Sequence, residues 1–177
     1  MAETVNKDIL RGGQFLVKET KCEDIFTPED FTEEQTMMRD AVKEFNEREI
    51  IPNKTRFEAK DYALTEETMR KAGELGFLGV AVPETYGGLG MGFVSTMLVC
   101  DYISSGTGSF STAFGAHTGI GTMPITLYGT EEQKQKYLPL VATGKASCAF
   151  ALSEKFAGSD AGGLSVRATK VDGGWRI

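Results

Sequence analysis

A turn of small residues near the end of the chain has residue types that suit the binding of a phosphate group. Residues 146–154 alternate apolar and polar side chains, which predicts a strand leading into this turn. Ala157, Gly158 and Ser159 follow, and small residues in a turn leave backbone N–H groups accessible. The hydroxyl of Ser159 adds a further donor. We therefore expect residues 153–160 to form an anion-binding turn.

Two other groups of residues could carry chemistry but are interpreted as structural. Residues 87–90 read Gly-Gly-Leu-Gly, yet they lack both the Lys-Ser/Thr ending of a nucleotide P-loop and the strand-to-helix frame of a dinucleotide site. We interpret them as a tight loop shaped by glycine. The only histidine, His117, has no Ser, Cys or Asp partner placed by a motif. We interpret it as a hydrogen-bonded core or cavity-lining residue rather than a catalytic base.

Neither a metal site nor a disulfide framework is expected. No Cys or His pair has the spacing of metal ligands. The three cysteines, Cys22, Cys100 and Cys148, are far apart and odd in number. This pattern predicts reduced thiols in a cytoplasmic compartment.

The composition is that of a globular domain and excludes several classes of protein. Of the 177 residues, 41% are hydrophobic and 25% are charged, so the chain can bury a core. A net charge of −6 disfavours nucleic-acid binding through bulk electrostatics. No apolar run approaches the roughly 20 residues of a membrane-spanning helix. The polar, acidic start fits neither a secretory signal nor a mitochondrial presequence. We expect a cytoplasmic protein without a membrane span.

Two amphipathic helices are predicted in the first half of the chain. Thr32 and Gln35 form a capping box, and the helix that they begin is expected to end near Ile50. A second helix is expected to begin at Thr65 and to end at Gly76, which suits a C-terminal cap. The predicted apolar faces consist of Met38, Ala41, Val42 and Phe45 in the first helix, and of Met69, Ala72 and Leu75 in the second.

Three further helices are predicted before residue 145. Residues 93–104 are apolar nearly all round, which predicts a helix buried on most sides. Residues 109–127 form another predicted helix, rich in Gly, Ala, Ser and Thr. Thr130 and Gln133 make a second capping box. We expect Pro139 to break or restart the helix that follows, because proline removes a backbone donor.

The period of the sequence changes after residue 145. Residues 165–171 predict a second strand, and Asp172-Gly173 a hairpin turn whose return strand would begin at Trp175. The chain ends within that apolar strand, so we expect a truncated sheet. The expected fold is mainly α, with a helical domain followed by the first strands of a β domain. The predicted segments are an N-terminal extension at 1–30, a helical domain at 31–145 and an incomplete β domain at 146–177.

Three blocks of the sequence, in matching order and spacing, resemble the acyl-CoA dehydrogenase family. They are ELGFLGVAVPETYGGLG at 74–90, IGTMPITLYGTEEQKQKYLPLVATG at 120–144 and AFALSEKFAGSD at 149–160. The resemblance covers roughly residues 30–177. Leu-Tyr-Gly at 127–129, Gly-Ala-His at 115–117 and the N-terminal extension are similar to the long- and very-long-chain branch.

The resemblance implies FAD-dependent α,β-dehydrogenation of fatty acyl-CoA thioesters, as in β-oxidation of fatty acids. In that family a glutamate removes the α-proton of the acyl group while hydride passes to the flavin. The implied partners are an acyl-CoA substrate and an electron-transferring flavoprotein, and the full-length protein is expected to be a homodimer or tetramer. The FAD contacts carried over by motif are Phe150, Leu152, Ser153, Gly158 and Ser159, and Ser159 is also expected at the acyl-CoA.

The third block departs from the family pattern at two positions. Lys155 replaces a proline and Phe156 replaces a small residue. Losing the proline is expected to loosen the turn slightly, because proline fixes φ.

No catalytic base is assigned in this chain, because the family's glutamate belongs to a C-terminal helical domain. Glu154 has a motif position in the flavin-binding turn, and Trp175 is interpreted as a strand residue rather than the family's flavin-stacking tryptophan. The piece alone is expected to be inactive and to bind flavin weakly or not at all.

Several alternatives stay open from the sequence. The small-residue helix could serve tight helix packing or form the wall of an acyl-chain tunnel. The whole protein could be an acyl-CoA oxidase or another oxygen-using flavoenzyme of the superfamily. It could also be a non-catalytic helical assembly module that retains the fold.

Overall fold

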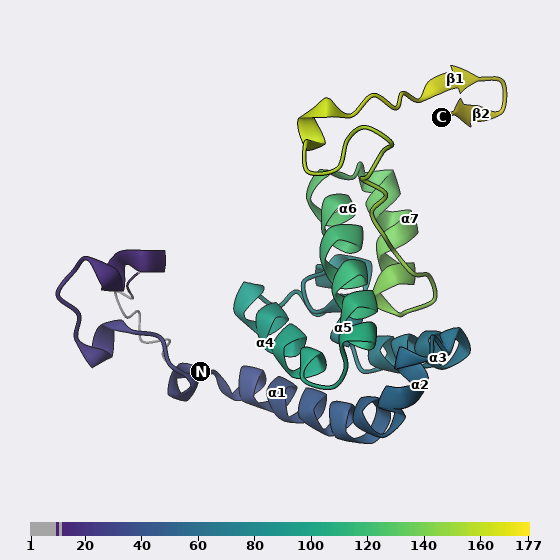
Figure 1. The fold of residues 1–177 in the computed structure, drawn as a ribbon. Helices are drawn as coiled ribbons and strands as arrows, with labels where there is room; N and C mark the ends of the chain where they lie inside the picture. Colours follow the sequence, from purple (N-terminus) through teal and green to yellow (C-terminus); the bar gives the residue numbers. More distant parts are fainter. Residues whose placement is uncertain (1–9, 11) are drawn as a thin grey trace.

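The computed structural model describes residue 10 and residues 12–177, and it is mainly helical, as predicted (Figure 1). Residues 1–9 and 11 of the expected extension lie outside the described residues. The helices are α1 (Glu33–Phe45), α2 (Lys54–Glu58), α3 (Tyr62–Glu74), α4 (Phe93–Ser104), α5 (Gly108–Gly115), α6 (Thr122–Tyr128) and α7 (Glu131–Ala142). The strands are β1 (Thr169–Val171) and β2 (Gly174–Arg176).

Helix α1 begins at the predicted capping box. The Thr32 hydroxyl accepts the Gln35 N–H at 3.1 Å, and the Gln35 side chain accepts the Thr32 N–H at 3.0 Å. The helix continues through a π turn, Asn46–Ile50, and a 3-10 turn, Ile51–Asn53, into α2. Val42 and Phe45 are buried as expected, whereas Ala41 is exposed, since it lies at the edge of the apolar stripe.

Helix α3 starts earlier than predicted. Its N-cap is Asp61 rather than Thr65, because the Asp61 carboxylate accepts the Leu64 N–H at 3.0 Å. The Thr65 hydroxyl instead donates to the Asp61 carbonyl, one turn back. Leu75 was predicted on the buried face but is 55% exposed, because it follows the last helical turn. Gly76 ends the helix as predicted, with a φ of 82° that favours glycine.

Helix α4 has the predicted bounds but is buried on one side only. Leu98, Val99 and Ile103 face the neighbouring helices α1 and α5. Phe93 is 75% exposed, and Val94 and Met97 are exposed with it. The prediction of burial on most sides was therefore wrong for the described residues, because no described element covers that side of the helix.

Helices α5 and α6 form one continuous helix joined by a π turn, Ala116–Gly121. Gly129 ends α6, and the predicted Thr130 capping box starts α7. Pro139 lies inside α7 and does not break it, contrary to expectation. The buried side chains of Leu138 and Val141 pack beside Val82 and hold this helix in place, which offsets the hydrogen bond that proline removes.

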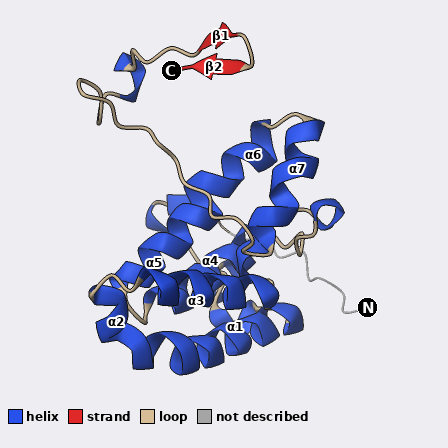
Figure 2. Cartoon of the chain, turned by 90° about the vertical axis from the view of Figure 1, so that its right-hand side faces the viewer, coloured by secondary structure: helices blue, strands red, loops and turns tan. Residues whose placement is uncertain are grey.

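Residues 146–154 do not form the predicted strand. A strand needs a neighbour for its backbone groups, and no described segment lies beside this one to pair with it. The predicted hairpin does form, with Lys170 opposite Trp175 and with Gly173 at a φ of 79°. Its first strand covers only the last part of 165–171. Figures 1 and 2 show the segment after α7 leaving the helical body before the hairpin.

The core of the described chain lies between the helices. The larger cluster joins α1, α2, α3, α4 and α5 with residues 77–80, and includes phenylalanine pairs such as Phe57 and Phe110, whose rings are tilted by 49° with centroids 5.2 Å apart. A smaller cluster joins α7 to Val82. In the part of the chain that the structure describes, no helix is both long and apolar enough to span a membrane.

Candidate functional site

The predicted anion-binding turn is a closed, solvent-facing loop. The Glu154 N–H donates to the Ala157 carbonyl at 2.8 Å, and the Ala157 N–H donates back at 3.4 Å. Ala157 is buried, whereas Ser153, Gly158 and Ser159 are exposed. Ser153 therefore lies just before the closed turn, and Gly158 and Ser159 lie just after it.

The two apolar residues predicted at the flavin lie just before this turn. Phe150 is 51% exposed and Leu152 is partly buried. They share the irregular segment with Ser153, and the turn adds Gly158 and Ser159. All five predicted contacts thus lie on one stretch of chain.

Glu154 organises the turn rather than offering a base. Its carboxylate accepts the Ser165 N–H at 2.8 Å, the Ser165 hydroxyl at 3.1 Å and the Val166 N–H at 3.1 Å. The hydrogen bond from the Ser165 backbone is the main reason why the pKa of Glu154 is lowered. A carboxylate held in its charged form by three donors is a weak proton acceptor at neutral pH. These contacts support the structural place given to Glu154 by its motif.

The two departures from the family pattern leave the turn closed. The Lys155 ammonium lies 5.0 Å from the ring centroid of Phe156, which is 85% exposed. The two hydrogen bonds between Glu154 and Ala157 form without the proline. The turn therefore carries the positive charge of Lys155 and keeps both of its closing hydrogen bonds.

The turn has room and donors for an anionic group. A Cβ added at Gly158 would meet nothing within 4 Å. Among the described residues, the N–H groups of Gly158 and Ser159 have no hydrogen-bond partner. With the hydroxyl of Ser159 and a lysine, Lys155, in the same turn, this donor set fits a pyrophosphate such as that of a flavin dinucleotide.

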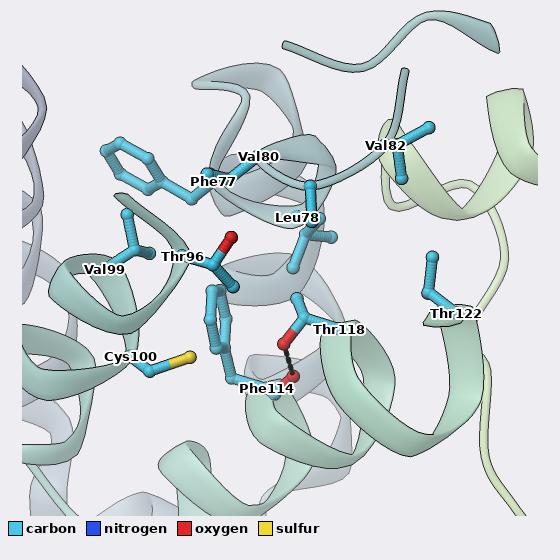
Figure 3. Close-up of a pocket in the computed structure, with 11 residues that line it drawn as sticks. Phe77, Leu78, Val80, Val82, Thr96, Val99, Cys100, Phe114, Thr118 and Thr122 are labelled. Atoms are coloured by element: carbon cyan, nitrogen blue, oxygen red, sulfur yellow. Dashed lines mark hydrogen bonds between the residues drawn. The ribbon is translucent and has the colours of Figure 1, made fainter. Parts of the chain in front are cut away.

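A second candidate site is an apolar pocket within the helical body (Figure 3). Its cavity volume is about 10 Å³, which is room for roughly one water molecule. Residues 77–82, helix α4 and the continuous helix α5–α6 form its walls. The lining residues are Phe77, Leu78, Val80, Ala81, Val82, Thr96, Val99, Cys100, Phe114, Thr118 and Thr122.

The polar side chains of the pocket are neutral, and its three threonine hydroxyls are already bonded. The Thr96 hydroxyl donates to the Gly92 carbonyl at 3.3 Å. The Thr118 hydroxyl donates to the Phe114 carbonyl at 2.9 Å, and the Thr122 hydroxyl donates to the His117 carbonyl at 2.7 Å. Burial raises the pKa of the Cys100 thiol, which keeps it protonated. Because no lining residue is charged, the lining is chemically compatible with an uncharged apolar chain, although the cavity as it stands is too small to hold one.

The small-residue helix turns out to pack closely at one point. A Cβ at Gly121 would lie 2.8 Å from the Cβ of Cys148, and a Cβ at Gly119 would meet nothing within 4 Å. Phe114, Thr118 and Thr122 on the same helix line the pocket. Tight packing is thus observed at Gly121, and the tunnel wall stays a proposal.

The glycine loop at 87–90 is structural, as interpreted. Gly87 and Gly90 have φ values of 83° and 61°. A Cβ at Gly88 would lie 2.0 Å from the Val82 carbonyl oxygen. Glycine is required here because the loop folds back on residues 79–82, where the Gly90 N–H donates to Val82.

His117 is the hydrogen-bonded core residue that the sequence predicted. It is 1% exposed. Its Nδ1 accepts the Cys148 N–H at 3.1 Å, and its Nε2 lies 2.9 Å from the Val141 carbonyl oxygen. Burial lowers the pKa of the imidazole. Within the described residues, no group of three or more His, Cys, Asp or Glu side chains is placed to hold a metal ion.

Sequence reasoning missed the pocket residues. Thr96, Cys100 and Phe114 come from helices whose patterns indicate only core packing. Their convergence depends on how α4, α5 and residues 77–82 pack in space. The run of small residues in 109–127 was the one feature of the local sequence that indicated a possible pocket wall.

The chain belongs to the acyl-CoA dehydrogenase family. The family model described as "Acyl-CoA dehydrogenase, N-terminal domain" matches residues 32–145, more than half of the chain. This match covers the helices that build the pocket and stops just before the segment that carries the anion-binding turn.

Relatives and solved structures extend the similarity to most of the chain. A probable acyl-CoA dehydrogenase of Bacillus subtilis (strain 168) is 41% identical over 167 residues, which are 94% of this chain and 28% of the relative. An acyl-CoA dehydrogenase of Bacillus anthracis, solved in complex with FAD, is 44% identical with a TM-score of 0.82. That alignment covers 90% of this chain and 27% of the solved one.

A butyryl-CoA dehydrogenase of Megasphaera elsdenii is 30% identical with a TM-score of 0.70, over 80% of this chain and 38% of the solved one. The chain therefore spans between about a quarter and two fifths of the length of these proteins.

Proposed function

We propose that this chain contributes part of the FAD site and part of the acyl-binding wall of an acyl-CoA dehydrogenase acting on fatty acyl-CoA thioesters. The observation that carries the proposal is the closed turn at 153–160, with its accessible donors at Gly158 and Ser159. The FAD complex of the Bacillus anthracis relative supports the choice of cofactor. Bound FAD would supply the acceptor for the hydride that leaves the acyl chain.

Each predicted contact has a chemical role in this proposal. The N–H groups of Gly158 and Ser159 hold the pyrophosphate of FAD, and the Ser159 hydroxyl also reaches the acyl-CoA. The Ser153 hydroxyl and the neighbouring backbone hydrogen-bond the polar edge of the flavin ring. Phe150 and Leu152 pack against its apolar part. The Glu154 carboxylate fixes the turn to residues 165–166, whose N–H groups it accepts.

The pocket between α4 and α5–α6 is the proposed wall for the acyl chain. Its neutral, mostly apolar lining matches the chemistry of a fatty acyl group and disfavours a charged one. A role in fatty-acid β-oxidation follows from that substrate class. The long- or very-long-chain branch, electron transfer to an electron-transferring flavoprotein, a homodimeric or tetrameric assembly and a cytoplasmic location belong to the same proposal. The catalytic glutamate would lie outside this chain.

The flavin contacts are tested by two substitutions in the turn of the full-length protein. Ser159→Ala removes a donor to a charged group, which is worth about 1.5–3 kcal/mol, so FAD affinity should fall by about 10- to 100-fold. Gly158→Val should weaken binding at least as much, because its side chain fills the open space at the turn. Calorimetric titration of the apoprotein with FAD measures both.

Gly162→Ala is the matched control, since its Cβ would make only an ordinary 3.5 Å contact with Asp160. FAD affinity should be unchanged in this variant. Unchanged affinity in Ser159→Ala and Gly158→Val would remove the turn from the flavin site.

A further inference from the structure

His117 joins the helical body to the segment that carries the proposed flavin contacts. It lies in the π turn between α5 and α6 and is buried. Nδ1 accepts the N–H of Cys148, which belongs to the segment after α7. An Nδ1 that accepts leaves the proton on Nε2, which then donates to the Val141 carbonyl in α7. One neutral ring thus bonds two other parts of the chain.

The position of Cys148 is also fixed by close packing against Gly121. Gly121, one turn further along the same helix, has room only for a hydrogen, because a Cβ would lie 2.8 Å from the carbonyl carbon and 2.9 Å from the carbonyl oxygen of Cys148. The Thr122 hydroxyl donates to the carbonyl of His117 and steadies the turn that holds the ring. Cys148 is therefore held by a hydrogen bond at its N–H and by a close contact at its carbonyl group.

The Cys148 N–H is the main attachment of a long unpaired stretch. Among the described residues, it is the one backbone N–H of residues 147–153 with a hydrogen-bond partner. Phe150 follows two residues later and Ser153 five residues later. A shift at Cys148 would therefore be transmitted to both predicted flavin contacts.

We propose that His117 is a positioning residue that sets the place of the flavin-binding segment through the Cys148 N–H. The inference rests on the proposed function. The ring acts through Cys148 and does not itself touch cofactor or substrate. Only the neutral ring can accept at Nδ1, and burial keeps it neutral by lowering the pKa of His117.

Two substitutions separate the two hydrogen bonds of the ring. In His117→Asn, the side-chain oxygen lies near the place of Nδ1 and can accept from Cys148, but it is too short to reach Val141. In His117→Gln, the amide lies near the place of Nε2 and can donate to Val141, but no acceptor faces Cys148. In the FAD-loaded full-length protein, the Asn variant should keep FAD affinity within about 3-fold, and the Gln variant should lose about 10-fold, equivalent to about 1.4 kcal/mol.

Amide hydrogen exchange gives a readout independent of the flavin. The Cys148 amide should stay protected in His117→Asn and exchange faster in His117→Gln. The visible circular dichroism of bound flavin should change only in the Gln variant. Cys148→Pro, which removes the N–H, should weaken FAD binding as His117→Gln does, and Cys148→Ala, which keeps it, should not. This pair tests the same bond if the histidine variants fold poorly.

The outcomes distinguish this role from the proposed function. Equal FAD affinity in all variants, or equal loss in His117→Asn and His117→Gln, would overturn the positioning role and leave His117 as a core residue only. A natural protein that does not bind FAD would overturn the proposed function and this role with it. Rapid exchange of the Cys148 amide in the natural protein would show that the bond itself is absent.

Discussion

At the residue scale, single side chains bond segments that are far apart in sequence. Asn46, at the end of α1, donates to the Tyr102 carbonyl at 2.9 Å and to the Ser105 hydroxyl at 2.8 Å. Gly106 lies so close that a Cβ would be 2.3 Å from the Asn46 Oδ1. His117 joins α7 and Cys148 in the same manner. The Asn46 Oδ1 itself has no hydrogen-bond partner among the described residues. Buried donors that are paired in this way contribute specificity, because leaving a buried donor unpaired costs about 1–3 kcal/mol.

The stability of the 177-residue chain should depend on pH through its one histidine. Burial lowers the pKa of His117 in the folded state, so the unfolded chain binds its proton first as pH falls. The stabilisation is present above about pH 6.5 and is lost below it, with a slope of at most about 1.4 kcal/mol per pH unit. Urea unfolding at pH 7.5, 6.5 and 5.5 measures this slope.

His117→Asn should abolish that slope, because it removes the titrating ring. The carboxylates with lowered pKa values, Asp61 and Glu154 among them, lose their stabilisation only at more acidic pH. The same slope in the natural chain and the variant would contradict the account of His117.

Two glycines two residues apart should respond oppositely to alanine. Gly121→Ala places a Cβ against Cys148 and should destabilise the fold by about 1–3 kcal/mol. Gly119→Ala meets open space in the same turn and should stabilise it by about 0.5–1 kcal/mol through helix propensity. Denaturant midpoints compare the two. Equal effects would mean that the segment after α7 does not pack on this helix.

At the element scale, local signals predicted helix starts well and helix burial poorly. The capping boxes at Thr32 and Thr130 are visible in four residues of sequence, and both form. The start of α3 was missed because Asp61 and Thr65 are both good caps, and only the geometry of Asp61 with Leu64 decides between them. Pro139 was misjudged because packing of α7 outweighs its local cost.

Helix α4 should control how much of an acyl chain the protein accepts. Thr96 lines the pocket, and Met97 beside it is exposed. Where the acyl chain lies against this wall, the larger side chain of Thr96→Phe should displace about two methylene groups, at about 0.8 kcal/mol each, and so weaken the binding of long acyl-CoA by about 10-fold or more. FAD binding should not change. KM values across a series of chain lengths check this.

Met97→Phe adds the same ring outside the pocket and serves as the control. It should leave the chain-length profile unaltered. A profile shifted equally by both variants, or by neither, would show that the pocket does not hold the acyl chain.

At the scale of the whole molecule, the mainly α fold and the family could be predicted from the sequence, but the pocket could not. The three family blocks are contiguous runs of sequence, so they can be recognised without knowledge of the fold. The pocket joins Phe77, Cys100 and Phe114, which meet only when three segments pack. The strand expected at 146–154 failed for a related reason, because alternation indicates a strand but cannot supply the neighbour with which it pairs.

The proposed flavin site likewise has a part that the sequence predicts and a part that depends on tertiary packing. Its residues could be named by motif, because they lie within one loop of ten residues or so. The attachment of that loop through His117 and Gly121 depends on tertiary packing, and the pattern of the sequence did not show it. The 177-residue chain presents only this side of the site, so we expect it to bind FAD weakly or not at all.

An anaerobic titration of the full-length protein with fatty acyl-CoA, followed by flavin absorbance, tests whether the protein is an acyl-CoA dehydrogenase. We expect the protein to purify with FAD and its flavin to bleach on adding substrate, whereas the 177-residue chain should show no such change. Peroxide released in step with substrate in air would indicate an oxidase instead. A protein that cannot be reconstituted with FAD, or one whose bound flavin no acyl-CoA reduces, would show that it is not an acyl-CoA dehydrogenase.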